Sequence, residues 1–167
     1  MTTQQKKTQA PGDTVKWAIV NGNSFEADDI AFSHTGEWWE LEAHTQRGNI
    51  GKSTGLYLAI KDASPQPLNG IFKIEDDLSI PLDKRDAWLF VLEEFAQDWY
   101  YAYTAAGQVE FKINPGGATT GTITARVEGV DLRGEFSVTQ TVGAVPRARN
   151  FVISGGQHRV PSPGFKS

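Results

Sequence analysis

The sequence predicts an all-β fold, a two-layer antiparallel β-sandwich. Short runs rich in β-branched and aromatic residues recur along the chain, and clusters of Gly, Asn, Asp and Pro separate them. The run 37–44 alternates apolar and polar side chains with a period of two, which indicates a strand with one buried face. About eight or nine such strands are typical of a sandwich or barrel, so a jelly-roll and a calycin-like barrel are the alternatives.

The first half of the chain contains five predicted strands. Turn residues follow the first two of them, at 21–23 and 35–36. The two prolines of segment 62–67 make it a loop, because proline cannot donate to a strand ladder. The predicted strands cover residues 14–20, 24–34, 37–44, 55–61 and 70–75.

The segment 83–96 fits two interpretations. Asp83 could cap a helix with one apolar stripe, formed by Trp88, Leu92 and Phe95. Residues 87–92 are continuously apolar and of strand length, and the aromatic run 99–103 after them favours a strand. The sequence therefore predicts a strand here, with at most a short helix near 83–96.

The second half of the chain ends in a predicted hairpin and a tail. A strand at 108–113 and a turn at 114–117 precede the hairpin, which is formed by 119–128 and 132–141. After residue 142 the strand pattern stops, apart from 150–154, which could be a late edge strand or a docking segment. The predicted organisation is a flexible N-terminal tail (1–13), a sandwich domain (14–142) and a basic, mostly flexible C-terminal tail (143–167).

Charge is distributed unevenly along the chain. All 20 acidic residues and 10 of the 16 basic residues lie between Asp13 and Val142, so this part carries a net charge of −10, although the whole chain carries −4. An acidic body repels phosphates, which argues against a nucleic-acid site on it. The basic C-terminal tail could bind an acidic surface, including the body of a neighbouring copy, so self-association is one predicted interaction.

Composition excludes several classes of site. The chain has no cysteine, which removes disulfides, thiolate metal ligands and cysteine nucleophiles. Residues 1–12 contain two lysines without an apolar run behind them, so no secretory signal is visible. No window reaches the roughly 20 apolar residues of a membrane helix. We expect no cofactor and no membrane span, and we take the cytoplasm as the default compartment.

Neighbouring aromatic residues are the most distinctive feature. Successive side chains of a strand point to opposite faces, so in each aromatic pair one ring faces the core and its neighbour faces outward, unless inter-sheet geometry buries both. An edge ring could also be covered by the tail segment 151–153. An outward ring beside a carboxylate is typical of a sugar-binding face, and an outward ring is equally typical of a protein interface. The candidate ligand-binding residues are Trp38, Trp39, Glu40, Trp99 and Tyr101.

Polar motifs supply further candidates. Asp76 and Asp77 are the candidate metal ligands, because calcium favours carboxylates gathered in a loop, although surface solubility also explains such a pair. The loop 46–54 contains Gly-Lys-Ser, as phosphate-binding loops do, but it lacks their first glycine and lies between two predicted strands. The histidines do not make a supported triad or zinc site; they are His34, His44 and His158.

Four segments combine turn glycines with strand alternation: VNGNSFEA at 20–27, GIFKI at 70–74, GTITA at 121–125 and GEFSV at 134–138. In this order they resemble small bacterial β-sandwich domains of unknown function, which are often lipoproteins. The resemblance covers residues 15–142 and implies the sandwich fold. It carries no catalytic or ligand-binding residue over to this chain.

Three functional hypotheses follow from these features. The first is a non-enzymatic binding or assembly module that presents loops and an aromatic face to a protein partner. The second is a carbohydrate-binding module that uses exposed Trp and Tyr side chains to bind a glycan. The third is a carboxylate-based hydrolase, in which Asp98 and Glu110 would have to face each other across a cleft. The first is favoured, because the sequence contains no evident nucleophile–base pair.

Overall fold

The computed structural model describes residues 12–35, 37–61, 69–77, 79–81, 84–113, 118–140 and 150–153. Within them the chain forms strands and no α-helix, which confirms the all-β prediction. The strands are β1 (Thr14–Ile19), β2 (Ser24–Glu26), β3 (Asp29–Thr35), β4 (Trp38–Thr45), β5 (Thr54–Lys61), β6 (Asn69–Ile74), β7 (Ala87–Ala96), β8 (Trp99–Lys112), β9 (Thr119–Val127), β10 (Val130–Val138) and β11 (Asn150–Ile153).

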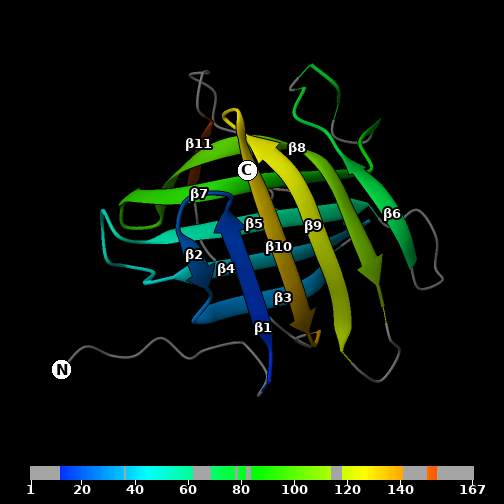
Figure 1. Ribbon diagram of the computed structural model, residues 1–167, viewed down its shortest axis with the longest axis horizontal. Coiled ribbons are helices and arrows are strands. Elements are labelled where there is room, and N and C mark those ends of the chain that lie inside the picture. Colours follow the sequence, from blue (N-terminus) through cyan, green and yellow to red (C-terminus); the bar gives the residue numbers. More distant parts are fainter. Residues whose placement is uncertain are drawn as a thin grey trace.

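The strands form one mixed sheet that is folded into two layers (Figure 1). Layer A contains, in order, β2, β1, β10, β9, the C-terminal half of β8, and β6. Layer B contains β3, β4, β5, β7, the N-terminal half of β8, and β11. The strands of the two layers cross each other in Figure 1. The outermost strands β2 and β3 do not pair in the described part of the chain, so the sheet is open, as in a sandwich, and not closed as in a calycin-like barrel.

The long strand β8 joins the two layers. Its first residues pair with β7, and from Ala105 onward it pairs with β9. Gly107 follows this change of partner, and a Cβ at Gly107 would lie 2.1 Å from the carbonyl oxygen of Thr124. Glycine therefore lets the backbones of β8 and β9 approach closely where the strand passes between layers.

Alternation along the strands builds the main core between the layers. In β4 the apolar side chains of Leu41 and Ala43 face inward, as the period of two predicted. They pack with buried side chains of layer A, among them Val109 and Ile123. Burial of these apolar side chains on both inner faces is the main contribution to the stability of the sandwich.

The outer face of layer B is also buried. A second cluster lies there, separate from the main core and formed by Tyr57, Ala59, Trp88, Phe90, Leu92, Tyr100, Ala102, Phe151 and Ile153. The last two belong to β11, which lies within the range that the sequence assigned to the C-terminal tail. β11 coincides with the segment 150–154, for which the sequence left open a late edge strand or a docking segment, and it pairs with β8.

Local expectations can be compared with the strands that form. The segment 83–96 contains strand β7, so the strand interpretation is confirmed for it. The single strand expected over 24–34 is instead two, β2 and β3. Conversely, 99–103 and 108–113 are parts of one strand, β8. No helix in the described residues has the length and apolar character needed to cross a membrane.

Candidate functional site

Three aromatic side chains at the end of the β7–β8 hairpin lie outside both apolar clusters. They are Phe95, Trp99 and Tyr101, and each is between 36% and 39% exposed. Tyr101 points to the same side of layer B as Tyr103, which packs against the main core. The three rings therefore lie on the inner face of layer B, beyond the area that layer A covers. We call them the aromatic patch.

The rings of the aromatic patch form a compact group. The centroids of Phe95 and Tyr101 are 4.2 Å apart with an interplanar angle of 27°, so these two rings stack. Trp99 is tilted by 52° relative to Phe95, with 6.3 Å between the centroids. Val152 of β11 lies in register with Tyr101 and extends the apolar surface. The rings of the patch thus do not lie in one plane.

A bulge and a tight turn lie beside these rings at the end of the hairpin. The register between β7 and β8 shifts between Glu94 and Ala96, and Asp98 in the turn has a φ of 60°, in the left-handed region that Asp tolerates. Glu94 faces the buried side of the hairpin and Phe95 faces the exposed side, as ordinary alternation along β7 requires.

The loop 46–54 makes polar contacts with the β7–β8 hairpin on the face opposite to the aromatic patch. The carboxylate of Glu94 accepts hydrogen bonds from the backbone N–H of Gly48 (2.8 Å) and of Asp98 (3.2 Å). Arg47 forms an ion pair with Asp98 at 3.1 Å. The loop therefore anchors the hairpin. It joins the antiparallel strands β4 and β5 without a helix, and the Gly48 amide that a phosphate would need is bound to Glu94.

The buried side of layer B also holds carboxylates paired with ring side chains. Glu42 Oε2 lies 2.6 Å from His44 Nε2, and Glu40 accepts a hydrogen bond from the Tyr57 hydroxyl. Burial raises the pKa of Tyr100 above its ordinary value, although Arg47, whose Nε donates to the Tyr100 hydroxyl, opposes this shift. These polar groups are buried and paired, as groups that stabilise a fold are.

A histidine oriented by a carboxylate is also what a general base requires. His44, however, is fully buried, and its Nδ1 has no hydrogen-bond partner in the described part of the chain, so no nucleophile lies within reach of it there. His34 stacks near Trp39 on the opposite face of β4, with 4.4 Å between centroids. The described residues therefore offer no catalytic triad around either histidine.

The other predicted ligand-binding residues are separated from the patch. Trp38 packs on Trp88 at the second cluster, with 6.1 Å between centroids, and Trp39 stacks on Phe32 at 5.5 Å in the main core. Glu40 is buried with Tyr57. Only Trp99 and Tyr101 lie together at the surface. Phe95 completes their group and was missed, because the apolar run that predicted the strand ends at Leu92. The alternation from Glu93 to Phe95 is the signal that could have found it.

The candidate metal ligands lie in an exposed loop after β6. The side-chain oxygen of Asp77 accepts hydrogen bonds from the backbone N–H and the hydroxyl of Ser79, at 2.9 and 2.6 Å, and these bonds lower the pKa of Asp77. Asp76 is exposed beside it. Nowhere in the described ranges do three or more His, Asp or Glu side chains come together in a way that could hold a metal ion.

The carboxylates of the hydrolase hypothesis do not meet. Asp98 lies in the β7–β8 turn and binds Arg47. Glu110 lies on layer A, where its carboxylate is 3.5 Å from Lys112. Asp98 precedes β8, and Glu110 lies twelve residues later, near the end of this strand. Between the two positions β8 passes from layer B to layer A.

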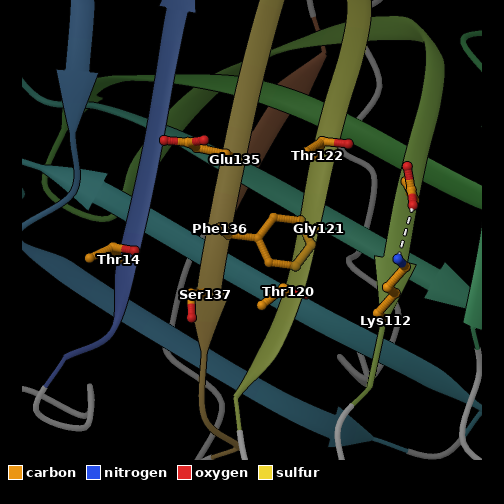
Figure 2. A pocket seen from close by; sticks show the side chains of 9 residues that line it. Thr14, Lys112, Thr120, Gly121, Thr122, Glu135, Phe136 and Ser137 are labelled. Atoms are coloured by element: carbon orange, nitrogen blue, oxygen red, sulfur yellow. Dashed lines mark ion pairs between the residues drawn. The ribbon is translucent and has the colours of Figure 1, made fainter.

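The outer face of layer A carries a shallow depression of about 440 Å³ (Figure 2). Hydroxyl and charged side chains surround it: Thr14, Glu110, Lys112, Thr120, Thr122, Glu135 and Ser137. Its only ring is that of Phe136, which lies beside Gly121 in Figure 2 and is 4% exposed. The depression therefore offers polar contacts but no aromatic surface on which a sugar ring could stack.

Comparisons with known proteins add no assignment. No protein-family model matches the chain, and neither the curated proteins nor the solved structures contain a match. Function is therefore argued from the site.

Proposed function

We propose that the protein is a non-enzymatic module that docks on a protein partner through the aromatic patch. The observation that carries the proposal is the exposure of three neighbouring aromatic rings on one hairpin, while Trp17, Trp88 and Tyr100 are almost fully buried. Clustered exposed aromatic side chains are costly in water, and they are the residues that contribute most to protein interfaces.

The support behind the patch suits this role. Glu94 and Arg47 tie the hairpin to the loop 46–54, so the rings are held in place before binding. A preorganised surface loses less conformational entropy when a partner binds. The body also carries a net charge of −10 between Asp13 and Val142, and Glu93 lies exposed beside the patch. A partner with an apolar centre and a basic rim would complement this surface.

Ring geometry favours a protein over a glycan. A sugar-binding platform needs ring faces that are open and close to coplanar, so that the sugar can stack on them. In the patch, Phe95 and Tyr101 cover one face of each other, and Trp99 is tilted by 52° relative to Phe95. An irregular cluster of this kind fits the side chains of a protein partner.

The proposal is tested with an array of short peptides that vary in net charge and apolar content. We expect binding to basic, apolar peptides, and at least roughly tenfold weaker binding by the double variant Trp99→Ala, Tyr101→Ala, because hot-spot aromatics each contribute about 2 kcal/mol or more. The matched control is Ile71→Ala, which removes an apolar side chain that is 64% exposed on layer A. Equal binding by the double variant and the control would contradict the proposal.

A glycan array with tryptophan fluorescence tests the alternative. If a glycan quenches the emission of the wild-type chain, and Trp99→Ala abolishes this effect, the carbohydrate-binding hypothesis replaces the protein-docking one. Under the proposal no glycan changes the emission of Trp99.

A further inference from the structure

Two exposed glutamates lie close to the aromatic patch. Glu93 is the partner of Tyr101 in the β7–β8 register, and it lies two residues before Phe95 on β7. Its side chain therefore points to the same face as these two rings. Glu128 lies in the turn between β9 and β10, near Tyr103, which follows Tyr101 on this face of β8. Both glutamate side chains are exposed.

These glutamates make the electrostatic potential beside the patch negative. Burial, followed by the negative charges of Glu93 and Glu128, raises the pKa of Tyr103 above its ordinary value. In the described part of the chain neither of the two glutamates forms an ion pair, whereas Glu110 on layer A has Lys112 beside it. No described basic side chain therefore neutralises the negative charge at the patch.

A carboxylate beside aromatic rings suits the guanidinium group of arginine. This group is planar, donates two parallel N–H bonds to one carboxylate, and stacks on aromatic rings. The aliphatic stem of arginine covers apolar surface at the same time. The ammonium group of lysine pairs with a carboxylate as a strongly hydrated point charge, so it gains less from neighbouring rings. Arginine therefore uses both the carboxylate and the rings, whereas lysine uses mainly the carboxylate.

The rest of the patch determines which residues should flank such an arginine. Trp99 lies two residues before Tyr101 on β8, with 6.3 Å between the ring centroids of Trp99 and Phe95. Both of these rings are at least 36% exposed. A peptide whose arginine reaches Glu93 places its neighbouring residues on these rings, and apolar side chains there remove the ring surface from water.

We propose that the aromatic patch recognises an arginine that is flanked by apolar residues on a protein partner. The guanidinium pairs with Glu93, the stem of the arginine lies against Tyr101, and the apolar neighbours pack on Phe95 and Trp99. Glu128 adds attraction at longer range. This inference rests on the proposed function and narrows it, because it names the side chain that the partner supplies.

Matched short peptides test the inference with the full chain. Each peptide has one variable residue between apolar neighbours, and this residue is arginine, lysine or citrulline, which has nearly the shape of arginine without its charge. Fluorescence polarisation of the labelled peptides measures binding. We expect the arginine peptides to bind most tightly, with at least roughly threefold weaker binding for lysine and roughly tenfold weaker binding for citrulline. Binding of the arginine peptides should also weaken as the salt concentration rises.

The variant Glu93→Gln shows whether this carboxylate is the partner of the arginine. Because the variant keeps the shape of the side chain and loses its charge, we expect it to bind arginine and citrulline peptides within about a factor of two of each other. The matched control is Glu110→Gln, which removes an exposed carboxylate on layer A and should keep the full preference for arginine. A preference for arginine that survives in Glu93→Gln, or that both variants lose equally, would overturn the inference.

Two further outcomes would also overturn the inference. Peptides that bind whatever the variable residue is, but lose binding in the double variant Trp99→Ala, Tyr101→Ala, would contradict the role of arginine and leave the proposed function intact. The chain's own basic residues are the alternative occupant, since Arg147 and Arg149 precede β11 in the sequence. If the double variant Arg147→Gln, Arg149→Gln bound the arginine peptides more tightly than the wild type does, the chain itself would supply the arginine. We expect no such gain.

Discussion

The two faces of the β7–β8 hairpin carry similar side chains but differ in what covers them. On one face, Phe90 and Tyr100 form, together with Tyr57 of β5, an aromatic socket that Phe151 of β11 fills, and both are fully buried. On the other face, the rings of the aromatic patch are more than a third exposed. The same strands thus carry one covered face and one exposed face, and the presence of a covering strand makes the difference.

Polar groups follow the same division. The hydroxyl of Tyr100 is bound by Arg47 on the buried face, and the hydroxyl of Tyr57 is bound by Glu40. A buried hydroxyl needs such a partner, because it has lost its hydrogen bonds to water. Most polar groups of the covered face therefore have partners, although His44 Nδ1 and Trp88 Nε1 have none in the described part of the chain, whereas an exposed face can leave this to solvent.

The largest expected effect comes from emptying the aromatic socket. Phe151→Ala removes a ring that contacts three others and is 2% exposed, so we expect a loss of about 3–5 kcal/mol in the free energy of unfolding. Urea unfolding at a fixed protein concentration measures this value. A loss below about 1 kcal/mol would show that β11 adds little to the fold and would remove the contrast between the two faces.

The second-largest expected loss of stability comes from removing the carboxylate of Glu94, which holds the loop 46–54 against the hairpin. Glu94→Ala leaves the backbone N–H groups of Gly48 and Asp98 without their carboxylate, so we expect a loss of about 2–3 kcal/mol and faster hydrogen exchange at both amides. The control is Glu110→Ala, which removes an exposed carboxylate from layer A and should change stability by about 0.5 kcal/mol or less. Equal effects of the two substitutions would contradict the anchoring role of Glu94.

Much of the fold follows from local rules. Side chains that alternate in a strand must face opposite sides, so the strand at 37–44 was predicted with the correct inner face. The continuity of β8 was not predicted, because a glycine at position 107 suggests a turn. In the structure, the backbone of Thr124 approaches Gly107 so closely that a side chain would not fit there. The two residues are far apart in the sequence and meet only because β8 pairs with β9.

The candidate site was predictable only in part. Alternation placed Trp99 and Tyr101 on one face, and they do share an exposed face. The same rule could not describe Trp38 and Trp39, which are both half-buried, because layer B is covered on its two faces. The outer cover includes β11, a strand from the far end of the chain, and no local pattern reveals its position.

Tyr100 should make the stability of the buried face sensitive to alkaline pH. Burial raises its pKa above the ordinary value of about 10, so the folded state keeps the proton that the unfolded state loses. Stability is therefore fully present below pH ~10 and falls as the pH rises further, by up to about 1.4 kcal/mol per pH unit for one group. Tyr100→Phe cannot ionise, so its stability should fall less steeply in urea melts between pH ~9 and ~11. Equal slopes for the two proteins would exclude a titrating Tyr100.

The smallest expected change in stability comes from the patch itself. Trp99→Ala removes the most exposed of the five tryptophans, and we expect the free energy of unfolding to change by about 0.5 kcal/mol or less, because the side chain is not part of either cluster. The same variant should lose a large share of the emission that acrylamide quenches, since the other tryptophans are half-buried or buried. If Trp99→Ala destabilised the chain as strongly as Phe151→Ala, the patch would be a part of the core, and the exposed rings would no longer indicate a docking surface.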